Sequence, residues 1–134
     1  MMKQKVRSVA VGLLVAGALP AMAVAQTVSD VHFPKGQYGT HVSGQVTGHD
    51  YHDYRLGAGA GQEMFVELDS GGSAYFNILP PGSDNVAIYN SSINGNATTV
   101  TLPEKGTYVI RVYLMGNAED SGQTVPFELD LSIQ

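Results

Sequence analysis

Strict alternation of apolar and polar residues constrains the fold of this chain more than any other feature of its sequence. The alternation runs through residues 63–69 and is clearest over residues 127–133. A period of two residues is typical of a β-strand that buries one face. Residues 74–78 repeat the pattern, and residues 107–115 are nearly all β-branched or aromatic, which indicates a central strand. Weaker strand patterns occupy residues 31–33, 40–47, 51–56, 86–89 and 98–102.

Turn-forming residues separate these patterns at short intervals. Gly, Pro and Asn favour turns because turns need a positive or a fixed φ. Short strands at this spacing predict an antiparallel sandwich or barrel. No segment after residue 25 has a helical period, and we expect the long polar connections at 90–97 and 116–124 to be loops, where binding function tends to lie. The turn segments are 34–36, 57–61, 70–72, 80–82, 94–96 and 104–106.

The first 25 residues have the three parts of a secretory signal peptide. Lys3, Lys5 and Arg7 are followed by an apolar stretch over 9–19 and by small residues at Ala23-Val24-Ala25. We predict cleavage after Ala25, with a competing site after Ala23. The mature chain is then a single domain of residues 26–134, periplasmic or secreted. No later stretch is long and apolar enough to cross a membrane.

Composition excludes several classes of function. Removal of the leader leaves four Lys and Arg against all 12 acidic residues, a formal charge of −8. Such an excess disfavours nucleic-acid binding, which needs clusters of Lys and Arg. The absence of cysteine excludes disulfides, thiolate zinc sites and iron–sulfur clusters. No G-x-S-x-G or H-E-x-x-H motif is present, so we expect a protein that is not an enzyme and has no cofactor.

The densest polar cluster covers residues 49–54, with two histidines and two aspartates. His49 and His52 could ligate a metal together with nearby aspartates, but an odd separation on a strand points them to opposite faces. A turn followed by a strand start, in which Asp50 caps backbone amides, explains the same residues. Direct contact with a partner is the third interpretation.

Arg111 stands in the middle of the most apolar strand pattern. Alternation places it on one face of that strand with Val109 and Tyr113. A charged residue in this setting either pairs with a carboxylate on a neighbouring strand or is an exposed contact residue beside Tyr113.

Two longer patterns resemble known families. Residues 48–56, 61–68 and 102–112 resemble the pre-peptidase C-terminal type of domain, a secreted module. This resemblance implies an all-β fold, an antiparallel, jelly-roll-like β-sandwich of about eight strands. A second pattern begins with F-x-K-G at 33–36 and S-G-x-V-x-G-x-D-Y-x-x-Y at 43–54. With Gly61-Gln62, G-T-Y-V-I-R-V at 106–112 and Asn117, it resembles the periplasmic inhibitors of g-type lysozyme.

The second resemblance implies an exported binding protein that docks surface loops into a lysozyme cleft. The loop at 116–124 departs from the family pattern because it has no Lys or Arg, and His49 stands where the pattern has Tyr. The lysozyme or other target and the oligomeric state stay open, as do two alternatives: a carbohydrate- or peptidoglycan-binding module, and a metal-stabilised module. The partner-binding positions carried over are His49, Asp50, Tyr51, Tyr54, Arg111 and Asn117, although Asp50 and Tyr54 equally fit a role in fixing the turn and packing the sheet.

Overall fold

The structure is a computed structural model that describes residues 24–134. The predicted signal peptide therefore lies outside the described residues, except for its last two positions. In the part of the chain that is described, none of the helices combines the length and the apolar character that a membrane span needs.

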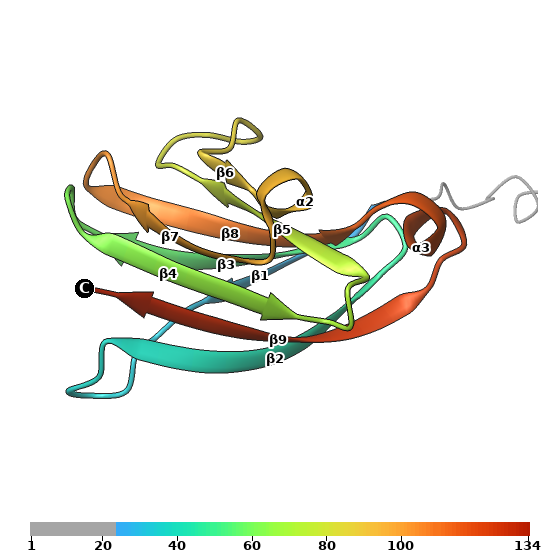
Figure 1. The fold of residues 1–134 in the computed structure, drawn as a ribbon, viewed down its shortest axis with the longest axis horizontal. Helices are drawn as coiled ribbons and strands as arrows, with labels where there is room; N and C mark the ends of the chain where they lie inside the picture. Colours follow the sequence, from blue (N-terminus) through green and yellow to red (C-terminus); the bar gives the residue numbers. More distant parts are fainter. Residues whose placement is uncertain (1–23) are drawn as a thin grey trace, which may run out of the picture.

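Two β-sheets pack face to face (Figure 1). The five-stranded sheet has the order β1-β3-β8-β5-β6, and the four-stranded sheet has the order β2-β9-β4-β7. All neighbouring strands are antiparallel except β1 and β3, which are parallel. The strands are β1 (Gln26–Asp30), β2 (Gly39–Thr47), β3 (Tyr51–Ala58), β4 (Glu63–Asp69), β5 (Ala74–Leu79), β6 (Tyr89–Asn90), β7 (Ala97–Thr101), β8 (Gly106–Leu114) and β9 (Thr124–Ile133).

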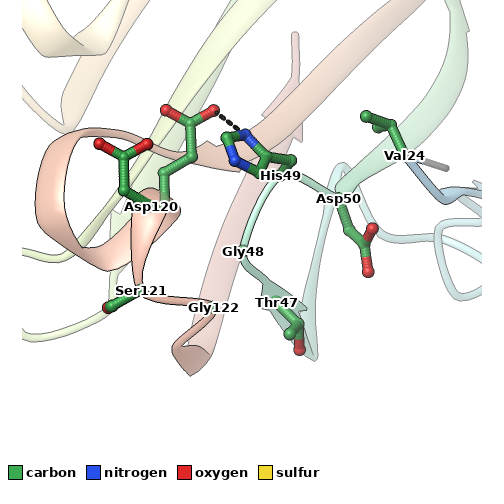
Figure 2. A pocket seen from close by; sticks show the side chains of 9 residues that line it. Val24, Thr47, Gly48, His49, Asp50, Asp120, Ser121 and Gly122 are labelled. Carbon is green, nitrogen blue, oxygen red and sulfur yellow. Dashed lines mark hydrogen bonds and ion pairs between the residues drawn. The ribbon is translucent and has the colours of Figure 1, made fainter. Parts of the chain in front are cut away.

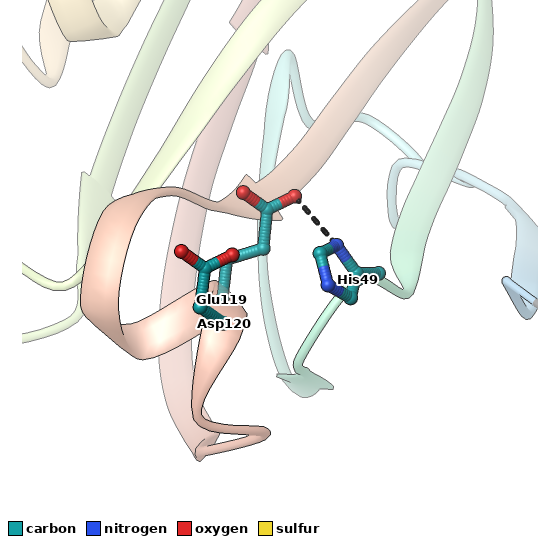
Figure 3. Close-up of side chains that lie close together, drawn as sticks. All are labelled: His49, Glu119 and Asp120. Carbon is teal, nitrogen blue, oxygen red and sulfur yellow. Dashed lines mark hydrogen bonds and ion pairs between the residues drawn. The ribbon is translucent and has the colours of Figure 1, made fainter. Parts of the chain in front are cut away.

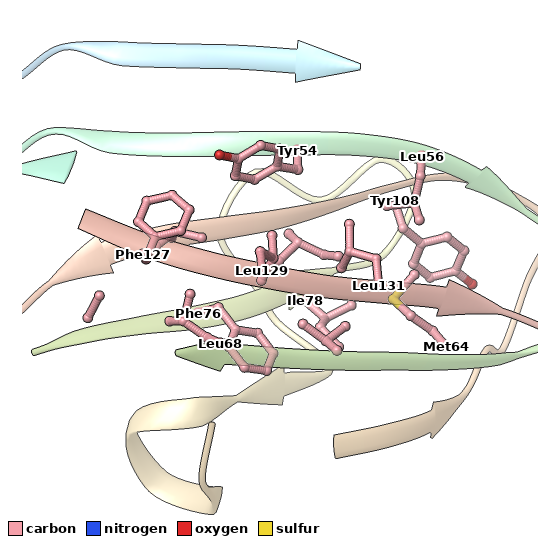
Figure 4. Packing of buried hydrophobic residues seen from close by; sticks show 14 of the residues in the cluster. Tyr54, Leu56, Met64, Leu68, Phe76, Ile78, Tyr108, Phe127, Leu129 and Leu131 are labelled. Atoms are coloured by element: carbon pink, nitrogen blue, oxygen red, sulfur yellow. The ribbon is translucent and has the colours of Figure 1, made fainter. Parts of the chain in front are cut away.

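These nine strands within residues 24–134 confirm the predicted all-β sandwich of about eight strands. The alternating segments behave as expected, because every second residue of β4, β8 and β9 is buried. Figure 4 shows these side chains filling the space between the sheets. The largest fully buried side chains are Tyr108, Phe76, Met64, Ile78, Leu79, Leu102, Ile110, Leu114, Leu129, Val66 and Val112.

Two of the weaker strand predictions are wrong in position. Residues 31–33 are not a strand, and β1 lies just before them at Gln26–Asp30. The polar residues of β1 show no alternation because this strand is held by its backbone pairing with β3 and has one free edge. Of residues 86–89 only Tyr89 is in a strand, since the Ser83 hydroxyl bonds both the N–H and the C=O of Val86 and closes a turn there.

The two expected polar loops each contain a short helix. Helix α2 (Ser91–Asn94) is capped by Asn90, whose side chain accepts a hydrogen bond from the Ser92 N–H. Helix α3 (Gly116–Asp120) connects β8 to β9. Neither helix is long enough to produce a helical period in the sequence.

Candidate functional site

Two connections meet at one end of the sandwich and form a surface that we call the end rim, defined as residues 47–50 and 115–123. The first is the β2–β3 turn and the second is the β8–β9 connection with α3. The Gly48 N–H donates to the Gln123 carbonyl at 2.9 Å, which ties the two connections together. Gly48 has a φ of +56°, and a Cβ there would lie 3.3 Å from the Gly122 Cα. A larger residue at position 48 would therefore be strained by this φ and would have to push the Gly122 backbone away by a few tenths of an ångström.

The end rim surrounds an open pocket with a volume of about 640 Å³. Figure 2 shows the turn on one side of this pocket and the α3 connection on the other. Val24 lines part of its edge in the uncleaved chain, and cleavage after Ala25 would remove it and leave the pocket more open. The lining residues are Val24, Thr47, Gly48, His49, Asp50, Glu119, Asp120, Ser121 and Gly122.

His49 makes the one side-chain hydrogen bond between the turn and α3 that the structure shows among residues 24–134. Its Nδ1 lies 3.1 Å from a Glu119 carboxylate oxygen (Figure 3). The Asp120 carboxylate lies on the same side, and the donor atoms of the three residues are all within 4.8 Å of one another. His49 and Asp120 are exposed, so this cluster faces solvent.

The Asp50 carboxylate caps a backbone amide, as one of its two predicted roles has it, but this amide is at Ala25 and not in its own turn. Its carboxylate accepts a hydrogen bond from the Ala25 N–H at 2.9 Å, and the following N–H of Tyr51 donates to the Ala25 carbonyl at 3.1 Å. Both bonds involve Ala25, the last residue of the predicted signal peptide, so cleavage after Ala25 would remove them from the mature chain and free the Asp50 carboxylate beside the pocket.

Tyr51 and Arg111 form a cluster with Asp53 on the outer face of the five-stranded sheet. Cross-strand register puts Asp53 directly opposite Arg111. The guanidinium donates to both Asp53 oxygens, at 2.7 and 2.9 Å, and lies 4.2 Å from the centre of the Tyr51 ring. Gln26 adds a third hydrogen bond to Asp53, at 2.7 Å. The hydrogen bond with Asp53 raises the pKa of Arg111, which keeps the guanidinium charged.

This arrangement confirms that Arg111 shares a face with Val109 and Tyr113, and of its two predicted roles it bears out the pairing with a carboxylate of a neighbouring strand. Asp53 is 5% exposed and Arg111 is 22% exposed. The pair is therefore largely removed from water and fixes the Tyr51 ring beside the end rim.

Tyr54 is a core residue and not a surface residue, in line with its predicted packing role. It is 3% exposed, and burial raises its pKa to about 12. The His52 ring stacks on it at 4.1 Å, and His52 Nε2 lies 2.8 Å from the Ser29 hydroxyl. Burial lowers the pKa of His52. The interpretation in which His49 and His52 share a metal is wrong, because His52 lies with Ser29 at the edge between the sheets and His49 faces Glu119.

Asn117 lies exposed in α3, where its carbonyl accepts hydrogen bonds from the N–H and hydroxyl of Ser121. Glu119 and Asp120 complete the end rim, and no motif in the sequence pointed to them. The signal available for them was the run of acidic residues in a polar connection, but nothing in the sequence placed that connection beside His49.

The outer-face tyrosines do not form a flat platform for sugar rings. The register aligns Tyr51, Tyr113 and Tyr75 across three strands. However, the Tyr75 and Tyr113 rings are tilted by 40° to each other, and the Arg111 guanidinium lies over the Tyr51 ring. Coplanar exposed rings, which a carbohydrate-binding module would use, are absent from this row of the described structure.

Comparison with known proteins gives matches among solved structures. No family model matches the chain, and no curated protein matches it. The chain is similar to the crystal structure of PliG from Aeromonas hydrophila, a periplasmic lysozyme inhibitor of g-type lysozyme. Identity is 35%, the match covers 84% of this chain and 100% of that chain, and the TM-score is 0.79. The chain belongs to the family of periplasmic inhibitors of g-type lysozyme.

Other structures of this inhibitor family agree with that placement. PliG from Salmonella Typhimurium is 30% identical over 81% of this chain and 98% of that chain, with a TM-score of 0.67. A PliG mutant from Escherichia coli is 28% identical over 83% and 100% of the two chains, with a TM-score of 0.66. The pre-peptidase C-terminal domain of a Bacillus anthracis collagenase is 14% identical with a TM-score of 0.55, which shows a shared fold. Both predicted resemblances are confirmed, and the PliG neighbours are inhibitors and not enzymes.

Proposed function

We propose that the mature chain is an exported, non-enzymatic inhibitor of a g-type lysozyme and that it binds lysozyme through the end rim. The observation that carries the proposal is the match to an inhibitor of g-type lysozyme along that inhibitor's whole length. The names of the similar structures also support a periplasmic location.

The geometry of the end rim supports it as the binding surface. Turn and connection residues are the parts of a sandwich that differ most freely between relatives and that carry binding function. His49, Asp50 and Asn117, three of the predicted contact residues, lie in or beside the rim, and the Tyr51–Arg111 pair adjoins it. Tyr54 supports this surface from the core.

Charge also supports a cationic partner. The mature chain has a formal charge of −8, and Glu119 and Asp120 place two of the acidic groups at the rim. A negative surface steers a basic protein towards it and raises the association rate, an effect that salt screens. Inhibition of a basic lysozyme should therefore weaken as the ionic strength rises.

The test is an inhibition assay with purified residues 26–134 against g-, c- and i-type lysozymes at low and high salt. We expect inhibition of the g-type enzyme, stronger at low salt. Inhibition of a different type alone would contradict the assigned target, and no inhibition at micromolar concentration would contradict the proposal as a whole.

A matched pair of variants tests the surface. Glu119→Gln removes one charge from the end rim and should raise the inhibition constant roughly fivefold, or about 1 kcal/mol. Glu104→Gln makes the same change in the β7–β8 connection, at the opposite end of the sandwich, and should leave inhibition unchanged (Figure 1). Equal effects of the two variants would contradict binding through the end rim.

A further inference from the structure

We propose that His49, Glu119 and Asp120 form a binding site for a divalent transition metal ion, zinc in particular, that links the β2–β3 turn to α3. One donor atom from each residue lies within 4.8 Å of the other two. Ligand atoms on a tetrahedral zinc ion lie about 3.4 Å apart, given zinc–ligand bonds of about 2.1 Å. Exposed side chains can close the remaining distance by small rotations.

The donor atoms of this cluster are largely free to bind an ion. His49 uses only Nδ1 for its contact with Glu119, and its Nε2 has no hydrogen-bond partner among residues 24–134. The Asp120 carboxylate likewise makes no hydrogen bond within the described part of the chain. The site therefore offers unused donor atoms, whereas His41 has both ring nitrogens engaged by carboxylates.

The backbone holds the donors in place from both sides. The bond from the Gly48 N–H to the Gln123 carbonyl fixes the turn next to α3, and the Gly122 N–H donates to the Glu119 carbonyl at 3.3 Å. Because the two sides are already joined, binding an ion orders little additional chain. The pocket beside the cluster leaves room for water molecules that would complete the coordination shell.

The donor set selects the class of ion. One imidazole nitrogen and two carboxylates suit zinc, which binds three protein ligands and a water molecule in open sites. Calcium and magnesium prefer oxygen ligands throughout, so a site with an imidazole favours zinc over both. Two adjacent carboxylates on α3 also repel each other, and a divalent cation between them relieves that repulsion.

Titration of the metal-free, untagged mature protein with zinc chloride in a calorimeter tests the proposal. We expect one zinc ion per chain, and a melting temperature that rises with zinc concentration but not with the same concentration of calcium or magnesium. The absence of saturable zinc binding would overturn the proposal, and so would equal binding of calcium.

Variants at exposed positions locate the site without disturbing the core. His49→Gln and Asp120→Asn should each weaken zinc binding at least tenfold, because the loss of an outer-shell partner alone costs roughly 10- to 100-fold. His41→Gln removes a histidine from the other histidine–carboxylate cluster and should leave zinc binding unchanged. Loss of binding in His41→Gln, with binding retained in His49→Gln, would overturn the assignment. Lysozyme inhibition measured in a chelating buffer separates failure of the zinc site from failure of the proposed function.

Discussion

Replacing Arg111 with methionine should strongly destabilise the chain, because it leaves the Asp53 carboxylate buried without its cation. Methionine keeps most of the apolar stem of the side chain, so the change removes mainly charge and hydrogen bonds. Asp53 retains one hydrogen bond, from Gln26. With the side chain 5% exposed, water cannot fully replace the lost donors.

The size of the effect follows from the contacts that are lost. Two hydrogen bonds between charged groups are removed, at 2.7 and 2.9 Å, each of a kind that contributes about 1.5–3 kcal/mol. The contact of the guanidinium with the Tyr51 ring contributes about 0.5–1 kcal/mol more. Because the Arg111 side chain is 22% exposed, water screens its interaction with Asp53 in part, which reduces the total. We expect a loss of about 3 kcal/mol, at the lower end of the range for a broken buried ion pair.

Urea unfolding followed by circular dichroism measures this loss of unfolding free energy. In thermal unfolding, the same loss should lower the melting temperature of Arg111→Met by about 12 °C. The matched control is Arg55→Met in the neighbouring strand β3, on the same outer face of the sheet as Arg111. Arg55 pairs with Asp30 at 2.9 Å, but both side chains are more than half exposed, so the expected loss is below about 1 kcal/mol. A loss below about 1 kcal/mol for Arg111→Met, or equal losses for both variants, would refute the reasoning from burial.

Two further predictions concern β2. Hydrogen bonds that the His41 ring donates to the carboxylates of Asp130 and Glu128 raise the pKa of His41 above 6.5, so its contribution to stability is present below about pH 6.5 and is lost as the pH rises through the raised value. The stability advantage of the natural chain over His41→Gln in urea unfolding should therefore shrink as the pH rises above about 6.5, and an advantage that grows with pH would contradict this. Gly44→Ala places a Cβ 2.6 Å from the Tyr54 hydroxyl oxygen and should lower the free energy of unfolding by about 1–3 kcal/mol, measured by thermal unfolding. An unchanged melting temperature would show that neighbouring side chains move to make room for the added methyl group.

The sequence predicts most of the sandwich because strand patterns are local. Alternating apolar and polar residues within one strand indicate which side chains are buried, and β4 and β9 could be located from that alternation alone. The same alternation placed Arg111 on the outer face. A strand without alternation cannot be located from its sequence pattern. The prediction misplaced β1 because the position of this strand depends on backbone pairing with β3.

The candidate site could be predicted only in part, for a related reason. Motif resemblance singled out His49, Asp50 and Asn117, which lie in or beside the end rim. It could not identify Glu119 as the partner of His49, since 70 positions separate the two residues along the chain. Nor could it distinguish Tyr54, which is buried, from Tyr51, which is half-buried on the outer face.

By itself, the sequence determined the fold class, the buried face of each alternating strand and the family. The first two depend on short-range periodicity, and the family depends on motifs that occur in the same order as in the family pattern. Only the tertiary structure decided which loops meet and which carboxylate pairs with which cation. The order of strands in the two sheets brings the β2–β3 turn beside the β8–β9 connection, and register sets Asp53 opposite Arg111. These contacts arise from the packing of the whole chain, and no stretch of neighbouring residues encodes them.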